Sequence, residues 1–224
     1  MILSHSLRCV FIAIPKTGTH SIRQALRPHL QPGDAEQVSL FAHSKLPYPE
    51  LARINHGHIS ATQLRPCLGA AEFDAYCKFS FVRNPFARFV SYAAFMGREQ
   101  GEFERAPRQF MKYLLDSVQP WNHILFRPQH EFVTDADGRL LVDVVGRVET
   151  MQQSWDAICA RIGIESAQLA ITNQSSHQGY ADYFDGELIE RVASLYRHDF
   201  ELFGYPPDGP LGGVAAPRLA PRKE

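Results

Sequence analysis

The stretch Arg8-Cys-Val-Phe-Ile-Ala-Ile14, followed by Pro15-Lys-Thr-Gly-Thr-His-Ser21, decides the fold class of this chain. Its first half is a short apolar run, rich in β-branched residues and ended by Pro15, and it predicts a buried, parallel strand. A helix is expected from about His20, with an apolar face at helical spacing. That face consists of Ile22, Ala25, Leu26 and Leu30. Strand, loop and helix in succession form the unit from which α/β folds are built.

A second unit of the same kind begins at Tyr76. Residues 76–82 predict another strand, Asn84 can cap the following helix, and Pro85 suits the first helical position. The apolar stripe of this helix consists of Phe86, Phe89, Val90, Ala93 and Ala94.

The remaining periodic segments complete an α/β pattern. We expect helices over 110–117, 151–162 and 187–203, the last ended by Gly204, and a hairpin over 131–145 that turns at 135–138. Strands interleaved with helices predict an α/β domain with a mainly parallel sheet flanked by helices. One domain is expected over 1–205, and the Pro-rich stretch 206–224 is expected to be a flexible tail.

Composition excludes several classes of protein. The 224 residues include 23 Lys and Arg against 24 Asp and Glu, so no overall basic field indicates a nucleic-acid partner. The four cysteines form no C-x-x-C pair, and we expect buried thiols and no metal site. Neither an apolar run of about 20 residues nor a signal peptide is evident, which predicts no integral membrane segment and a cytoplasmic location.

The loop Pro15–Ser21 has the composition of an anion site. Ligands of open α/β sheets bind at the carboxyl ends of strands, and a helix N-terminus there favours negative charge. Gly18 allows close backbone approach, Lys16 adds a positive charge, and Thr17, Thr19 and Ser21 add hydroxyl donors. The spacing differs from the nucleoside-triphosphate loop, in which Lys follows the second of two glycines. An ordinary turn with a capping Thr is the alternative.

The segment Phe81-Val-Arg-Asn-Pro-Phe-Ala-Arg-Phe-Val-Ser-Tyr92 repeats this arrangement after the second strand. Arg83 can bind a phosphate through two hydrogen bonds. Ser91 shares a helix face with Asn84 and Arg88 and can reach the same anion. The alternative is an Arg at the sheet edge and a Ser bonded within its own helix. Together the two segments suggest a ligand with two separated anionic groups.

The pair PKTGTHS and FVRNPFARFVSY resembles the cofactor-binding motifs of sulfotransferases, enzymes that use 3′-phosphoadenosine 5′-phosphosulfate (PAPS) and release 3′-phosphoadenosine 5′-phosphate (PAP). The resemblance is closest to carbohydrate sulfotransferases of the heparan sulfate 2-O-sulfotransferase type. It extends from about Arg8 to Tyr205, with further similar segments at Pro128-Gln129, 145–149 and 196–205. The family fold is a parallel sheet with helices on both sides, related to the P-loop nucleotide kinases.

The resemblance implies roles for particular residues. The 5′-phosphosulfate would be held by Pro15, Lys16, Thr17, Gly18, Thr19, His20 and Ser21, with His20 acting through its backbone. Arg83 and Ser91 would hold the 3′-phosphate. Ser175 and Ser176, with His177, lie in a late polar loop that either lines the nucleotide pocket or is a plain surface loop. Arg127, Gln129 and His130 either contact the acceptor or form a local helix end.

The segment His56-Gly57-His58 lies between the two cofactor motifs. A neutral imidazole can remove the proton of an acceptor hydroxyl, since its pKa lies near neutrality. The segment resembles the HGH of the heparan 2-O-sulfotransferases, which implies His58 as the base, with His56 in reserve. Lys16 would offset charge on the leaving group. A His pair satisfied in the core and a two-His metal site are the alternatives.

These observations predict a sulfotransferase that moves a sulfuryl group from PAPS to an acceptor hydroxyl, on a saccharide or lipid-linked saccharide, without a metal. The absence of a Golgi-type anchor favours a bacterial enzyme. Two other functions stay open: a small-molecule kinase with a P-loop-like site, and a non-catalytic nucleotide-binding module. The position sulfated and the oligomeric state are not determined by the sequence.

Overall fold

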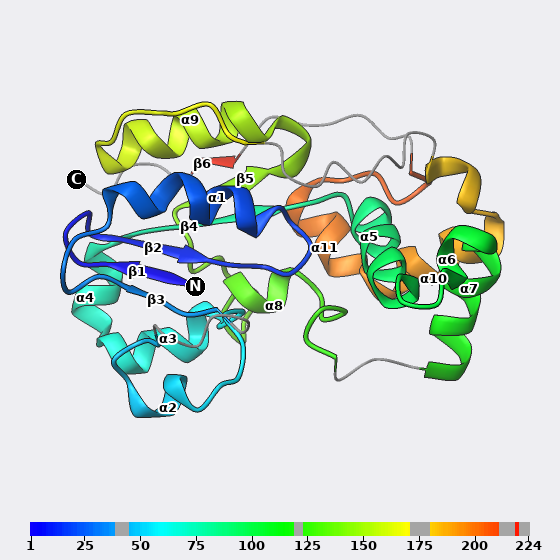
Figure 1. Cartoon of the computed structure of the whole chain (residues 1–224), viewed down its shortest axis with the longest axis horizontal. Coiled ribbons are helices and arrows are strands. Elements are labelled where there is room, and N and C mark those ends of the chain that lie inside the picture. The colour runs from blue at the N-terminus through cyan, green and yellow to red at the C-terminus, as the bar shows by residue number, and fades with distance from the viewer. Residues whose placement is uncertain (39–44, 119–122, 171–179, 211–217, 220–224) are drawn as a thin grey trace. The chain divides into compact units, whose positions relative to one another are not determined.

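The computed structural model describes residues 1–38, 45–118, 123–170, 180–210 and 218–219, and it divides into two compact units (Figure 1). The sheet unit comprises Met1–Val82, Gln129–Thr172 and Ala216–Glu224. The helical unit comprises Arg83–Pro128 and Asn173–Ala215. The expected single domain ending at residue 205, with a tail behind it, stays a prediction.

The sheet unit is built on one mixed sheet with the strand order β3-β1-β2-β4-β5-β6. Its strands are β1 (Ile2–Ser4), β2 (Cys9–Ile12), β3 (Ala35–Glu36), β4 (Cys77–Val82), β5 (Val144–Arg147) and β6 (Arg218–Leu219). The three central strands β2, β4 and β5 are parallel, whereas β1, β3 and β6 pair antiparallel with their neighbours. The expectation of a mainly parallel sheet is therefore correct only for the centre. A connection of four residues joins β1 to β2, and parallel strands need a much longer crossover.

Helices cover the sheet on both sides (Figure 1). They are α1 (Thr19–Leu26), η1 (Arg27–His29), α2 (Pro49–Ala52), α3 (Ala61–Leu68), α4 (Ala70–Ala75), α8 (His130–Val133), η3 (Val148–Thr150) and α9 (Met151–Ile162). Figure 1 shows α1 and α9 on one side, and α3, α4 and α8 on the other. Between the sheet and the first pair, Phe11 and Phe79 stack at 5.3 Å and pack with Ile22 and Trp155 into the buried core.

Strand β2 ends two residues earlier than the apolar run predicts. The carbonyl of Ala13 lies 2.7 Å from a ring nitrogen of His58, and the carbonyl of Ile14 accepts a hydrogen bond of 2.9 Å from the Thr17 hydroxyl. Both carbonyls are thus bonded to side chains of the candidate site instead of to a neighbouring strand. The helix expected after this loop is confirmed as α1.

The hairpin expected over 131–145 is confirmed only as a short turn, in which the N–H of Leu141 donates to the carbonyl of Val133 and the N–H of Asp135 to that of Arg139. Residues His130–Val133 form α8, and a single bridge pairs Thr134 with Leu140 around the expected turn. The following residues form β5, which is buried and pairs in parallel with β4. A continuous apolar strand gains more by lying inside a sheet than by forming a two-stranded ribbon.

In the part that the structure describes, the helical unit contains no strand. Its helices are α5 (Pro85–Gly97), α6 (Glu102–Arg105), α7 (Pro107–Tyr113), the π-helical segment η2 (Leu114–Val118), η4 (Tyr180–Tyr183), α10 (Gly186–Leu195) and α11 (Arg197–Phe203). The expected cap of α5 is confirmed, because Asn84 Oδ1 accepts from the N–H groups of Phe86 and Ala87. The helix expected over 110–117 is α7 followed by η2.

The long helix expected over 187–203 is interrupted at Tyr196. This residue has φ −106° and ψ 25°, and its buried hydroxyl donates a hydrogen bond of 2.8 Å to the carbonyl of Phe126. A tertiary contact at the centre of the segment therefore divides it into α10 and α11. Its end is as expected, since Gly204 adopts the left-handed conformation with φ 66°.

Candidate active site

The loop Pro15–Ser21 joins β2 to α1 as predicted. Thr17 and Ser21 are buried, Lys16 and Thr19 are half-buried, and Gly18 and His20 are exposed. Gly18 is the N-cap of α1, and among the described residues no side chain caps this end. The first N–H groups of a helix have no partner within it, so this end of α1 is suited to an anion.

Two residues of the loop have left-handed backbone conformations. Gly18 has φ 71°, and a Cβ placed on it lies 2.6 Å from the Met151 Cε atom at the start of α9. Lys16 has φ 65°, a conformation that costs an L-residue with a side chain about 1–2 kcal/mol. Lys16 thus has a backbone conformation that glycine or asparagine adopts more easily. Backbone strain of this kind is often found at functional sites.

His58 is next to this loop. Its Nδ1 lies 2.7 Å from the carbonyl oxygen of Ala13, two residues before Pro15. A carbonyl can only accept, so Nδ1 carries the proton and Nε2 keeps its lone pair. The imidazole is therefore fixed in the tautomer that a proton acceptor needs.

The surroundings of His58 keep it uncharged. Burial lowers its pKa to about 3, and the positive charge of Arg23 acts in the same direction. The expected pKa near neutrality is therefore wrong for the free protein. The imidazole is neutral at pH 7, yet it is a weaker base than an ordinary histidine.

The stretch His56–His58 is irregular. The two rings are nevertheless close, with centroids 6.1 Å apart, and the N–H of His58 lies 3.3 Å from His56 Nδ1. His56 is half-buried, like His58. Both candidate bases thus belong to one cluster beside the loop.

Gln37, which the sequence analysis missed, holds this segment in place. Its buried side-chain nitrogen donates to the carbonyls of Leu51, Ile54 and His56 at 3.0, 2.8 and 3.2 Å. Its backbone carbonyl lies against Gly57, where an added Cβ comes within 1.9 Å of the oxygen. Glycine is therefore required between the two histidines. A single Gln in a polar stretch carries no sequence signal of such a role.

Gln37→Leu should lower the free energy of unfolding by about 2 kcal/mol, because three carbonyls lose their donor while the side-chain volume is kept. Urea unfolding measures this loss. Gln24→Leu, at an exposed position of α1, is the control and should leave stability within about 0.5 kcal/mol. A Gln37→Leu protein as stable as this control contradicts the role of the amide.

The low pKa of His58 predicts a pH dependence of stability. Between about pH 6.5 and pH 3 the unfolded chain binds a proton at this residue and the folded chain does not. Stability is therefore lost as the pH falls through this window, by up to about 1.4 kcal/mol per pH unit. Urea unfolding at pH 7.5 and pH 5 should show a smaller pH effect in His58→Gln than in the wild type. Equal slopes contradict the prediction.

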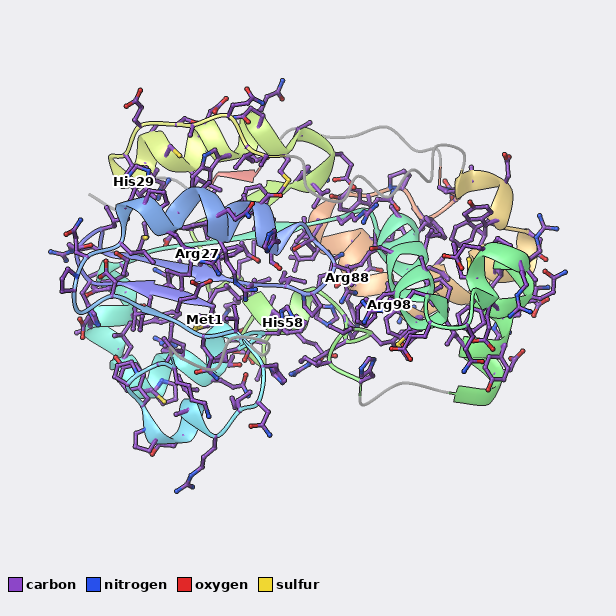
Figure 2. The ribbon with its side chains drawn as sticks, viewed as in Figure 1. Met1, Arg27, His29, His58, Arg88 and Arg98 are labelled. Carbon is purple, nitrogen blue, oxygen red and sulfur yellow. The ribbon has the colours of Figure 1, made fainter. Side chains whose placement is uncertain are left out.

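The second predicted anion site lies in the helical unit. Arg83 directly precedes the capped start of α5, Ser91 lies two turns into this helix, and both are half-buried. Arg88, on the same face and labelled in Figure 2, is buried. Its Nη2 donates to the carbonyls of Leu125 and Arg127 at 3.2 and 2.7 Å. Its guanidinium is therefore part of the core of this unit.

The other candidates have separate outcomes. Ser175, Ser176 and His177 lie outside the described residues. Gln129 is buried, and His130 begins α8. Cys9 and Cys159 are buried as expected, whereas Cys67 and Cys77 are half-buried.

Among the residues that the structure describes, no group of three or more His, Cys, Asp or Glu could hold a metal. No helix in this part of the chain is long and apolar enough to span a membrane.

A family model described as the sulfotransferase family matches residues 1–206. Searches of curated proteins and of solved structures give no match. The matched segment includes the strand–loop–helix unit, the HGH segment and α5. This chain therefore belongs to the sulfotransferase family.

Proposed function

We propose that this chain transfers the sulfuryl group of PAPS to a hydroxyl of a saccharide or lipid-linked saccharide. Membership of the sulfotransferase family supports the reaction class. The main support for the mechanism is the contact between His58 Nδ1 and the carbonyl of Ala13. This contact holds a neutral imidazole beside the start of the loop Pro15–Ser21, which is suited to an anion.

The donor has binding groups in both motifs. The uncapped start of α1, Lys16 and the loop hydroxyls suit the 5′-phosphosulfate, and Arg83 with Ser91 suits the 3′-phosphate. The loop follows β2 and Arg83 follows β4, which are neighbouring parallel strands. When bound, PAPS supplies an activated sulfur and a stable phosphate leaving group.

The residues of this chain then have separate tasks. His58 Nε2 takes the proton of the acceptor hydroxyl as the new S–O bond forms and the bond to the bridging oxygen breaks. Lys16 offsets the negative charge that this oxygen gains. Negative charge bound beside an imidazole raises its pKa, so donor binding makes His58 a stronger base.

Two experiments test this function. PAP should raise the melting temperature, and ATP with magnesium should have little effect, since at equal concentration the ligand that binds the folded protein more tightly stabilises it more. Incubation with PAPS and a library of saccharides should give products heavier by one SO₃ group in mass spectrometry. Stabilisation by ATP with magnesium instead of PAP favours a kinase. Binding of PAP without transfer to any acceptor favours a non-catalytic module.

Arg83→Ala should weaken PAP binding by about 1.5–3 kcal/mol, the value of a hydrogen bond to a charged group. Binding of adenosine 5′-phosphosulfate, which lacks the 3′-phosphate, should hardly change. Isothermal titration with both ligands measures the difference. Arg98→Ala is a matched control in the same unit, because Arg98, labelled in Figure 2, is exposed, and its Cζ lies 4.3 Å from the centroid of the Phe95 ring. Equal losses for both ligands in Arg83→Ala contradict a role in reading the 3′-phosphate.

A further inference from the structure

An arginine with a largely buried side chain lies against the HGH segment. Arg23 is on α1, on the helix face that also carries Thr19 and Arg27, four residues to either side. Its side chain is only 11% exposed, and its Nη2 lies 2.9 Å from the position of a Cβ on Gly57. The guanidinium is therefore packed against the residue that precedes His58.

The charge of Arg23 is only partly neutralised. Its Nε lies 3.6 Å from Glu36 Oε1, beyond hydrogen-bond distance. The same carboxylate accepts two hydrogen bonds from Arg27, at 2.8 and 3.0 Å. Two guanidinium groups thus share one carboxylate, and one positive charge is left in excess. Among the described residues, Nε and Nη2 of Arg23 have no hydrogen-bond partner.

A largely buried guanidinium without a full set of hydrogen-bond acceptors destabilises the folded protein. A buried guanidinium normally has a full set of acceptors, because desolvation of a charge is expensive. Burial lowers the pKa of Arg23 to about 10, so the group is still charged at pH 7. A positive charge held here disfavours a second positive charge on the nearby imidazole.

We propose that Arg23 is a positioning residue for His58, and that its partly neutralised guanidinium, packed against Gly57, adds to burial in keeping the imidazole neutral. This inference rests on the proposed function insofar as His58 is the base. The charged or titratable groups that face His58 are Arg23, His56 and the Met1 amino group (Figure 2 labels Met1 and His58). Glu36 raises the pKa of Arg23 and so helps to keep its guanidinium charged.

The test is a titration of His58 in the free protein, followed by NMR of the imidazole C–H groups and assigned by the loss of signals in His58→Gln. Arg23→Gln removes the inner charge and should raise the pKa of His58 by about half a unit or more. Arg23→Lys keeps the charge and should titrate like the wild type. Arg27→Gln removes an equal charge from a side chain that is 42% exposed, and should have a much smaller effect.

Three results overturn the inference: an unchanged titration in Arg23→Gln, an equal shift in Arg23→Lys, or an equal shift in Arg27→Gln. In the active enzyme, the acidic limb of kcat/KM should move to higher pH in Arg23→Gln and return toward the wild-type position in Arg23→Lys. The NMR titration needs neither donor nor acceptor. If it shifts as expected and PAPS gives no product, the proposed function fails and the coupling of Arg23 to His58 stands. If PAPS gives product and the titration does not shift, only the inference fails.

Discussion

His58→Ala should lower kcat by about 10²–10⁴-fold, the usual contribution of a positioned general base. A sugar hydroxyl is a poor nucleophile at pH 7, so its proton must leave as the S–O bond forms. Nδ1 of His58 is bonded to the carbonyl of Ala13, and Nε2 is therefore the nitrogen able to accept this proton. Steady-state assays with PAPS and a saccharide acceptor measure the loss.

The variant should keep its fold and its donor site. Loss of the bond to Ala13 costs about 1 kcal/mol, and the affinity for PAP should be nearly that of the wild type. The matched control is His56→Ala, since His56 belongs to the same cluster and contacts the backbone N–H of His58. If His56→Ala is inactive and His58→Ala is not, the base is His56. If both retain normal turnover, the segment is structural, and His130 and His177 are the next candidates.

The pH profile gives an independent measure of the same role. Because kcat/KM reports groups of the free enzyme, its acidic limb should lie far below neutrality, in line with the pKa of about 3 for His58. The acidic limb of kcat reports the loaded enzyme and should lie at higher pH, since bound negative charge favours the imidazolium form. Both limbs should vanish in His58→Ala. If either acidic limb persists unchanged in His58→Ala, that limb reports the titration of another group.

Lys16→Met should lower kcat by about 10²-fold or more, because a preorganised charge acts most strongly on the negative charge that develops in the transition state. The affinity for PAP should fall too, but by a smaller factor, since the same charge also faces a phosphate present in the ground state. Assays of kcat and KM with PAPS, together with PAP titration, separate the two effects.

The left-handed backbone of Lys16 provides a second variant. Lys16→Gly also removes the charge, and at the same time it relieves the backbone strain at φ 65°. Loss of turnover to the same extent in both variants, with a folded protein in each case, assigns the effect to the charge. A normal kcat with a raised KM in Lys16→Met would mean that Lys16 binds the ground state and the transition state equally and does not contribute to kcat. Activity retained in Lys16→Gly alone makes the strain, and not the charge, the feature that matters.

Much of the local architecture follows from the sequence. Pro15 ends the apolar run, Asn84 and Pro85 start α5, and Gly204 ends α11, because caps and breakers act through neighbouring backbone atoms. The two anion-suited segments were also predictable, since an apolar strand followed at once by Gly, hydroxyl residues or Arg forms a local pattern. α3 was missed, although Ser60 and Gln63 form the capping box that signals its start.

Long-range contacts decided the rest. The orientation of the edge strands, the replacement of most of the hairpin by α8 and β5, and the break at Tyr196 depend on partners distant in sequence. The protonation of His58 also depends on partners distant in sequence. Its tautomer is fixed by the carbonyl of Ala13, 45 residues away, and its neutral state by burial and by nearby charge. Hydrogen bonding and desolvation depend on which groups meet in space, so the sequence could name this histidine, and only the tertiary structure determined its protonation.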